Sequence, residues 1–280
     1  MTTLALPAAG TTRSGSARRI AALARAELTL LRRNPLALFN AFVVPVALGA
    51  LLHLSEANDG GPFAEPGAAA ATAGSRLVVL IVSFALLSIV YLNGLMALVA
   101  RRQDGVLKRL RTGEVTDGEI FAGTAAGGVG LLWVQTALAL ASAALFLHLG
   151  MPVNPVLVLI GLAAGTFVVS LLAALTSIVT RTVEMAQVTV MPFLLVTLMF
   201  GGLKPANTFP GALRWVAEVL PMTHVLELIT LGLTGEAPSG AHVSGAATFA
   251  QAIVPLLALG AWAAVGLLVT RRWFRWEPRQ

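Results

Sequence analysis

Residue types that carry chemistry are sparse in this sequence and form no catalytic or metal-binding pattern. The chain has no cysteine, which excludes disulfides, thiolate nucleophiles and cysteine-ligated metals. The histidines, which show no metal-ligand spacing, are His53, His148, His224 and His242. Neither lysine fits a phosphate-binding loop, because Arg109 follows Lys108 and Pro205 follows Lys204 where Ser or Thr is required. We therefore predict that this chain has no catalytic residue and binds no metal or cofactor.

The composition is that of a membrane protein. Of 280 residues, 57% are hydrophobic and 11% are charged, and the mean hydropathy is +0.83. A soluble domain carries charge on about 25% of its residues. At about 20 apolar residues per spanning helix, this length accommodates six or seven spans and leaves no room for a fused nucleotide-binding domain. The expected fold is an all-α membrane protein.

Six uncharged apolar runs predict six transmembrane helices. They are Leu36–Leu54, Leu77–Ala100, Thr124–Leu149, Pro155–Thr180, Met185–Leu203 and Thr248–Thr270. Ion-coupled transport relies on ionisable groups inside the membrane, and these runs contain no Asp, Lys or Arg. A transport function would therefore draw its energy from a separate cytoplasmic subunit.

The N-terminal segment predicts a disordered cytoplasmic tail followed by a helix on the membrane surface. Residues 1–16 are small and polar. On a helix, residues 17–33 would have an apolar face and an opposite basic face that includes Arg25 and Arg33. Glu27 interrupts the apolar face. Because an unpaired buried carboxylate is costly, Glu27 either pairs with a basic residue of a cytoplasmic connection or stays hydrated at the surface.

A semi-apolar segment, residues 209–233, separates the fifth and sixth runs. It is too polar to face lipid and too apolar for an ordinary loop, which predicts a re-entrant or interfacial helical hairpin packed against protein; a seventh span is the alternative. Proline lacks an amide donor, so the chain should turn at Pro221. The pairs expected from their spacing are Arg214 with Glu218, and His224 with Glu227.

The distribution of basic residues predicts the orientation in the plasma membrane. Of the 19 Lys and Arg residues, 16 fall on one side of the six predicted spans. The three on the other side are Arg76, Lys204 and Arg214. Because cytoplasmic loops carry the excess of basic residues, both termini are expected in the cytoplasm.

The cytoplasmic connection at residues 101–119 is the best candidate for docking an energy-supplying subunit. On a short helix here, one arc of about 100° holds Val106, Leu107 and Leu110, and the far side holds Asp104, Lys108 and Arg111. Such a helix offers both apolar and charged groups to a rigid contact. The alternative is a solvated loop whose arginines only set the orientation.

Three motifs, in this order, resemble one family. They are Arg33-Asn34-Pro35 before the first run, Arg102-Gln103-Asp104-Gly105-Val106-Leu107-Lys108-Arg109-Leu110-Arg111 in the connection, and Gly201-Gly202 through Pro205, Phe209-Pro210, Leu213 to Ala217 and Leu220-Pro221-Met222-Thr223-His224 after the fifth run. From about residue 18 to 273 the chain resembles the transmembrane subunit of type-2 ABC (ATP-binding cassette) exporters, the permeases of drug, antibiotic and polysaccharide export. Gln103-Asp104 and Val106 stand where that family commonly has Glu and Thr.

The resemblance implies a single permease domain over residues 17–280, working as half of a transporter. Two permease copies, identical or related, would pair with two ATPase subunits that bind ATP and Mg. It identifies residues 17–33 as a connecting helix, with Arg25, Glu27 and Arg33. The implied coupling helix consists of Asp104, Gly105, Val106, Leu107, Lys108, Arg109, Leu110 and Arg111. The implied extracellular gate is the 209–233 hairpin, with Arg214, Glu218, Pro221, His224 and Glu227.

The expected substrate is a small amphipathic or apolar molecule such as a drug, an antibiotic or a lipid-like compound. Polysaccharide exporters of this family line their path with aromatic rings, and this chain has one Tyr and no rows of Phe or Trp. Side chains that could line the path, or could simply pack between helices, are Asn40, Ser83, Ser88, Asn93, Met191, Phe193, Thr197 and Met199.

Two alternatives remain open. One is a polysaccharide or glycolipid permease of the same family. The other is an intramembrane lipid-modifying enzyme, which would need clustered His, Asp or Glu at the membrane surface. Membrane lipid is an expected partner in every case, and nucleic acid in none.

Single-cysteine labelling tests the orientation in this cysteine-free background. We expect cysteines at Lys108 and Arg181 to react with an impermeant maleimide only after cells are permeabilised. Cysteines at Asp59 and Glu236 should react in intact cells. Labelling of position 108 in intact cells would contradict the predicted orientation.

Overall fold

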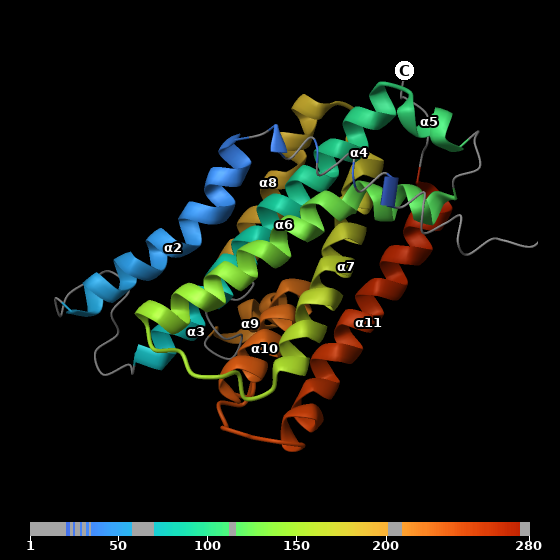
Figure 1. The fold of residues 1–280 in the computed structure, drawn as a ribbon. Helices are drawn as coiled ribbons and strands as arrows, with labels where there is room; N and C mark the ends of the chain where they lie inside the picture. Colours follow the sequence, from blue (N-terminus) through green and yellow to red (C-terminus); the bar gives the residue numbers. More distant parts are fainter. Residues whose placement is uncertain are drawn as a thin grey trace, which may run out of the picture.

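A computed structural model of the protein describes residues 21–22, 25, 29, 32–33, 35–57, 70–111, 116–200 and 209–274. Nearly all of them are helical (Figure 1), and the only strand pairing within these ranges is an isolated antiparallel bridge between Glu236 and His242. The helices are α2 Pro35–Ala57, α3 Ala70–Ala85, η1 Leu86–Leu92, α4 Asn93–Gln103, α5 Val106–Arg111, α6 Asp117–Phe146, α7 Pro155–Val179, α8 Val183–Phe200, α9 Gly211–Val219, α10 Pro221–Thr234 and α11 Ala247–Trp273. The protein is an all-α membrane protein, as its composition predicted.

The helices lie where the apolar runs predicted spans. Within the described residues, four helical stretches are long and apolar enough to cross a membrane, and they are Ala73–Gln103, Asp117–Phe146, Pro155–Val179 and Ala247–Trp273. They match the predicted second, third, fourth and sixth spans. α2 and α8 match the first and fifth spans, with shorter described apolar stretches at Phe42–Leu51 and Val183–Thr197. The count of six spans stays a prediction.

The third span begins earlier than predicted, at Asp117 instead of Thr124. Thr116 and Glu119 form a capping box: the Thr116 amide donates to Glu119 Oε2 (2.8 Å), and the Glu119 amide donates to Thr116 Oγ1 (3.4 Å). A capping box satisfies amides that have no partner within the helix. The predicted 101–119 connection is therefore shorter, because α4 continues through Gln103 and the first turn of α6 includes Glu119.

A π-helical segment, η1, interrupts the second span between α3 and α4. It buries Tyr91, whose hydroxyl hydrogen-bonds Thr176 Oγ1 on α7 (2.9 Å) and whose ring packs on Phe193 of α8, with ring centroids 4.6 Å apart. A π-helical turn offsets the side chains from the α-helical register. The hydrophobic pattern alone did not predict this offset.

The bundle has α2 and α11 at opposite edges, with α10 at the lower end of the view between α3 and α7 (Figure 1). α2 packs against α3 and α6, and α11 packs against α7 and α10. The buried core lies mainly between the second span, α7 and α10. α10 is therefore an interior element, although it is too short to be a span of its own.

Small residues let α10 pack closely on α7. Gly161 and Gly165, four residues apart on α7, face Val225 and Ile229 of α10. A Cβ at Gly165 would lie 2.6 Å from Val225 Cγ1, closer than real side chains come. Small residues spaced four positions apart commonly allow helices to pack closely in membranes. Here they allow α10 to pack against the fourth span.

Replacing Gly165 by Ala tests this packing. We expect the variant to lose about 1–3 kcal/mol through overpacking. The matched control is Gly260→Ala on α11, where a Cβ meets nothing within 4 Å. That variant should be neutral, or more stable by up to about 1 kcal/mol, since alanine is the better helix former. Thermal unfolding in detergent measures both variants, and equal stability of the two would contradict the close contact.

Candidate functional site

The C-terminal end of α4, where the sequence predicted a group of basic residues, carries a buried guanidinium. Arg102 is 1% exposed. Its Nη1 donates to the carbonyl of Ser177 (2.8 Å), and its Nη2 donates to the carbonyl of Thr180. Carbonyls in the last turn of a helix have no partner within it, and a cation there is favoured by the helix dipole. Arg102 thus caps the C-terminal end of α7.

The two neighbours of Arg102 hold two other helices. Arg101 Nη1 donates to Thr124 Oγ1 on α6. Gln103 Oε1 accepts a hydrogen bond from the backbone amide of Val183, the first residue of α8 (3.3 Å). Consecutive side chains at the end of α4 therefore contact α6, α7 and α8, and we name Arg101, Arg102 and Gln103 the α4 junction.

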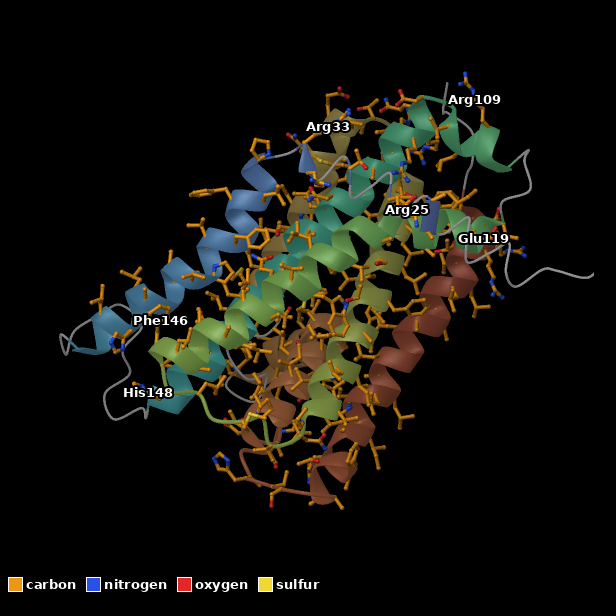
Figure 2. All side chains as sticks on the ribbon, in the orientation of Figure 1. Arg25, Arg33, Arg109, Glu119, Phe146 and His148 are labelled. Carbon is orange, nitrogen blue, oxygen red and sulfur yellow. The ribbon has the colours of Figure 1, made fainter. Side chains whose placement is uncertain are left out.

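The predicted coupling helix, α5, follows the α4 junction after two residues. Asp104 ends α4, and Gly105 makes the turn with φ 69°, a left-handed conformation that favours glycine. α5 begins at Val106, and exposed Arg109 lies at the same end of the molecule as the start of α6 (Figure 2). The side chains of Lys108, Leu110 and Arg111 lie outside the described part of the structure.

Leu107 does not stand on the outer face of α5, where the sequence pattern placed it beside Val106. It is buried against Ile120 of α6, next to Phe121 and Phe274, whose rings make an edge-to-face contact at 4.9 Å. The physical reason is tertiary: the start of α6 lies beneath α5 and covers its apolar side. Leu107 therefore fixes α5 to α6.

The described residues of the predicted connecting helix lie at the same end of the molecule as α5. Figure 2 shows Arg25 and Arg33 toward the same end of the molecule as Arg109 and Glu119, whereas Phe146 and His148 lie at the opposite end. Arg25 and Arg33 are exposed. Glu27 lies outside the described residues, so its pairing stays a prediction.

The 209–233 segment contains two helices with a sharp bend between them, and its re-entrant course stays a prediction. α9 and α10 meet at 79° on either side of Leu220, and Pro221 is the first residue of α10. Thr223 Oγ1 donates across the bend to the Ala217 carbonyl (2.6 Å). The indole Nε1 of Trp262 donates to the Val219 carbonyl (2.9 Å), which ties the bend to the middle of α11.

Both polar pairs predicted for the hairpin are present. Arg214 Nε lies 2.6 Å from Glu218 Oε1 on exposed α9, and His224 Nδ1 lies 3.2 Å from Glu227 Oε2 on α10. The second pair is largely buried, as is most of α10. Burial of so much apolar surface within the bundle identifies α10 as part of the protein interior.

The side chains expected to line a substrate path do not share one surface. Ser83 and Thr197 are buried, Ser88 is half-buried and donates to its own helix at the Phe84 carbonyl (2.6 Å), and Phe193 packs on Tyr91. These four side chains pack between or along helices, which is the alternative to lining a substrate path.

Other members of the set are open to the surroundings but on different faces. Asn93 lines a groove between α4, α6, α7 and α11. Met191 and Met199 lie on the exposed face of α8. The side chain of Asn40 lies outside the described residues. A path role stays a prediction for Asn40, Asn93, Met191 and Met199.

The chemistry that this arrangement supports is binding and mechanical coupling. Across the described residues, no three His, Asp or Glu side chains come together as a metal site. Residues 18–233 match the family described as ABC-2 type transporter. The chain belongs to the ABC-2 type transporter family. The match extends from the predicted connecting helix to the end of α10, and no curated protein matched the chain.

As an ABC-2 type transporter, this chain contains the multi-pass membrane domain of a permease. Permeases of this family work with an ATPase subunit and often dimerise. The coarse prediction from the sequence, a permease of a type-2 ABC transporter, is confirmed. The substrate, the specific partners and the orientation are not tested by the match.

Sequence reasoning missed the α4 junction of this ABC-2 permease. Arg101 and Arg102 were counted as charges that set the orientation, and Gln103 only as a departure from a family motif. One signal was available: a pair of arginines follows an uncharged apolar run directly, so the helix that carries them continues to the membrane edge. Tyr91, the single tyrosine of the chain, was also missed.

Substituting Arg102 by Met tests the capping role. We expect a loss of at least about 3 kcal/mol of stability, because carbonyls at the buried end of α7 lose a charged donor. Arg181→Met, an exposed arginine two residues past the end of α7, is the control and should cost less than about 1 kcal/mol. The measurement is thermal unfolding of the purified protein in detergent. Similar losses in the two variants would show that Arg102 does not cap α7.

Proposed function

We propose that this chain is the membrane subunit of an ATP-driven exporter, and that α5 is where the ATPase subunit docks. The observation that supports this most directly is the α4 junction. A force applied to α5 reaches α6, α7 and α8 at once, because Arg101, Arg102 and Gln103 bind one helix each.

Two attachments make α5 a firm lever in this proposal. On one side, only Asp104 and Gly105 separate it from α4. On the other, Leu107 is buried against Ile120 of α6. A short helix held at both points moves with the bundle, so displacement by a partner is not lost in bending of a loop.

The α9–α10 hairpin is proposed as the outer closure, and α7 connects it to the α4 junction. Arg102 holds the C-terminal end of α7, and Gly165 of the same helix contacts Val225 of α10. The twelve helical residues between Gly165 and Ser177 span roughly 18 Å. A shift of α7 that starts at Arg102 therefore acts on the gate residues Glu218, Pro221, His224 and Glu227 through a rigid helix.

The exposed apolar face of α8 is the proposed contact with a second permease copy, identical or related, and with the substrate. Its large exposed side chains recur at helical spacing and are Met185, Val188, Met191, Leu195 and Met199. Methionine side chains adapt to partners of different shape. This surface fits a small amphipathic or apolar substrate better than a polysaccharide, for which aromatic platforms are expected.

In the same proposal, the distribution of basic residues sets the orientation of the permease in the membrane. The end that carries α5, Arg25, Arg33 and Arg109 (Figure 2) is placed in the cytoplasm, with both termini, and the hairpin is placed toward the outside of the plasma membrane. ATP and Mg are then bound by the partner ATPase.

Charge reversal on α5 tests the docking proposal. We expect Arg109→Glu to reduce recovery of the ATPase with the tagged permease by tenfold or more, since a like-charged or unpaired group at a docking surface costs several kcal/mol. Export of toxic amphiphiles should fall with it. Arg181→Glu, in another predicted cytoplasmic connection, is the matched control and should leave recovery unchanged. Wild-type ATPase recovery and export by Arg109→Glu, with normal expression, would contradict the assignment of α5.

A further inference from the structure

An open groove of about 1050 Å³ runs along the bundle between α4, α6, α7 and α11. On α6 it extends from Asp117 to Trp133, sixteen residues apart, which is roughly 24 Å along the helix. Eleven of its thirty lining residues are glycine or alanine, and Phe167 and Leu267 are among the larger side chains. The groove therefore extends from the charged end of the bundle to the middle of its apolar region.

The groove faces the surroundings of the bundle and not its interior. Only 22% of the apolar window of α11 is buried, the smallest share among the four long spans. α11 and α2 lie at opposite edges of the molecule (Figure 1), so the groove is remote from α2. In a membrane, an open apolar groove at this edge is filled by lipid or by a lipid-like molecule.

The charged end of the groove is suited to an anionic head group. Arg271 and Arg272 line it and are exposed, and neither has a carboxylate partner within the described residues. The lining also includes one carboxylate, that of Asp117. Basic pockets between transmembrane helices at the cytoplasmic side are typical sites for anionic lipid head groups.

A polar side chain at the same end has no partner. Thr270 lines the groove and is 7% exposed, and its hydroxyl has no hydrogen-bond partner in the described part of the chain. Buried hydroxyls are normally paired. After rotation about its Cα–Cβ bond, this hydroxyl could donate to an oxygen of a phosphate or glycerol group held by the adjacent arginines.

We propose that this groove binds one anionic phospholipid, with its phosphate at Arg271 and Arg272 and its acyl chains along α6 and α11. The gradient from basic to apolar along one continuous surface fits an amphiphile with a single charged end. The proposal rests on the proposed cytoplasmic orientation only for the leaflet in which the lipid lies. Binding itself does not depend on an ATPase partner or on transport.

Lipid retention by the purified permease tests the proposal. Protein in detergent is titrated with dioleoylphosphatidylglycerol or dioleoylphosphatidylcholine, and bound lipid is counted by native mass spectrometry while thermal stability is followed in parallel. We expect one phosphatidylglycerol to be retained, and phosphatidylglycerol to raise the unfolding temperature more than phosphatidylcholine does. Because failed binding would leave ATPase recovery by α5 unaffected, it is distinguishable from failure of the proposed function.

Two variants separate the head group from the acyl chains. Arg271→Gln combined with Arg272→Gln should lower the preference for phosphatidylglycerol by roughly tenfold or more. Ala163→Phe fills the groove from an exposed position on α7 and should abolish retention of either lipid. The matched controls are Arg181→Gln and Ala141→Phe, which change exposed residues outside the groove and should retain lipid as the wild type does.

Several outcomes would overturn the proposal. Equal retention of the two lipids by the wild type would show nonspecific annular binding only. Undiminished retention by Ala163→Phe would place the lipid elsewhere. Displacement of bound lipid by exported amphiphiles, with no lipid preference of its own, would make the groove a substrate site and not a lipid site.

Discussion

The buried charge of Arg102 is the constraint on which the α5 end of this permease depends. A guanidinium removed from water must be satisfied by hydrogen bonds and by favourable electrostatics, and at this position it finds carbonyls at the end of α7. α4 therefore cannot slide or rotate against α7 without separating a buried cation from its acceptors. The same restriction fixes Arg101 and Gln103, and through them α6 and α8.

This constraint propagates through α7 to the other end of the molecule. The N-terminal end of α7 is also held by hydrogen bonds: Asn154 Nδ2 donates to Thr248 Oγ1 of α11 (2.8 Å), and the Asn154 amide donates to the Gly232 carbonyl of α10 (2.8 Å). Between these points Gly165 lets Val225 approach closely. Within the described residues, α7 and its N-cap Asn154 are thus bonded to the α4 junction, the hairpin and the last span.

Features set by local sequence were predictable, and features set by contacts between helices were not. The bend at Pro221 and the pairs Arg214–Glu218 and His224–Glu227 depend on residues within one turn of each other, so spacing was sufficient. The inward position of Leu107 depends on its contact with Ile120 of the next helix. The positions of these two residues in the sequence do not predict that contact. The π-helical offset at Tyr91 and the groove beside α11 likewise depend on the packing of distant segments, for which a single sequence carries no direct signal.

Counting arginines to orient the chain treats them as equivalent, yet the structure gives them different environments. Arg102 is buried and caps a helix, Arg109 is exposed on α5, and Arg271 and Arg272 line the mouth of a groove. Because 16 of the 19 basic residues fall on one predicted side, removing one leaves most of that bias in place. The effect of a single arginine substitution therefore reports its local contact and not the orientation of the protein. The same basic residues therefore bias the orientation together and make specific contacts individually. Substituting one arginine at a time separates the second role from the first.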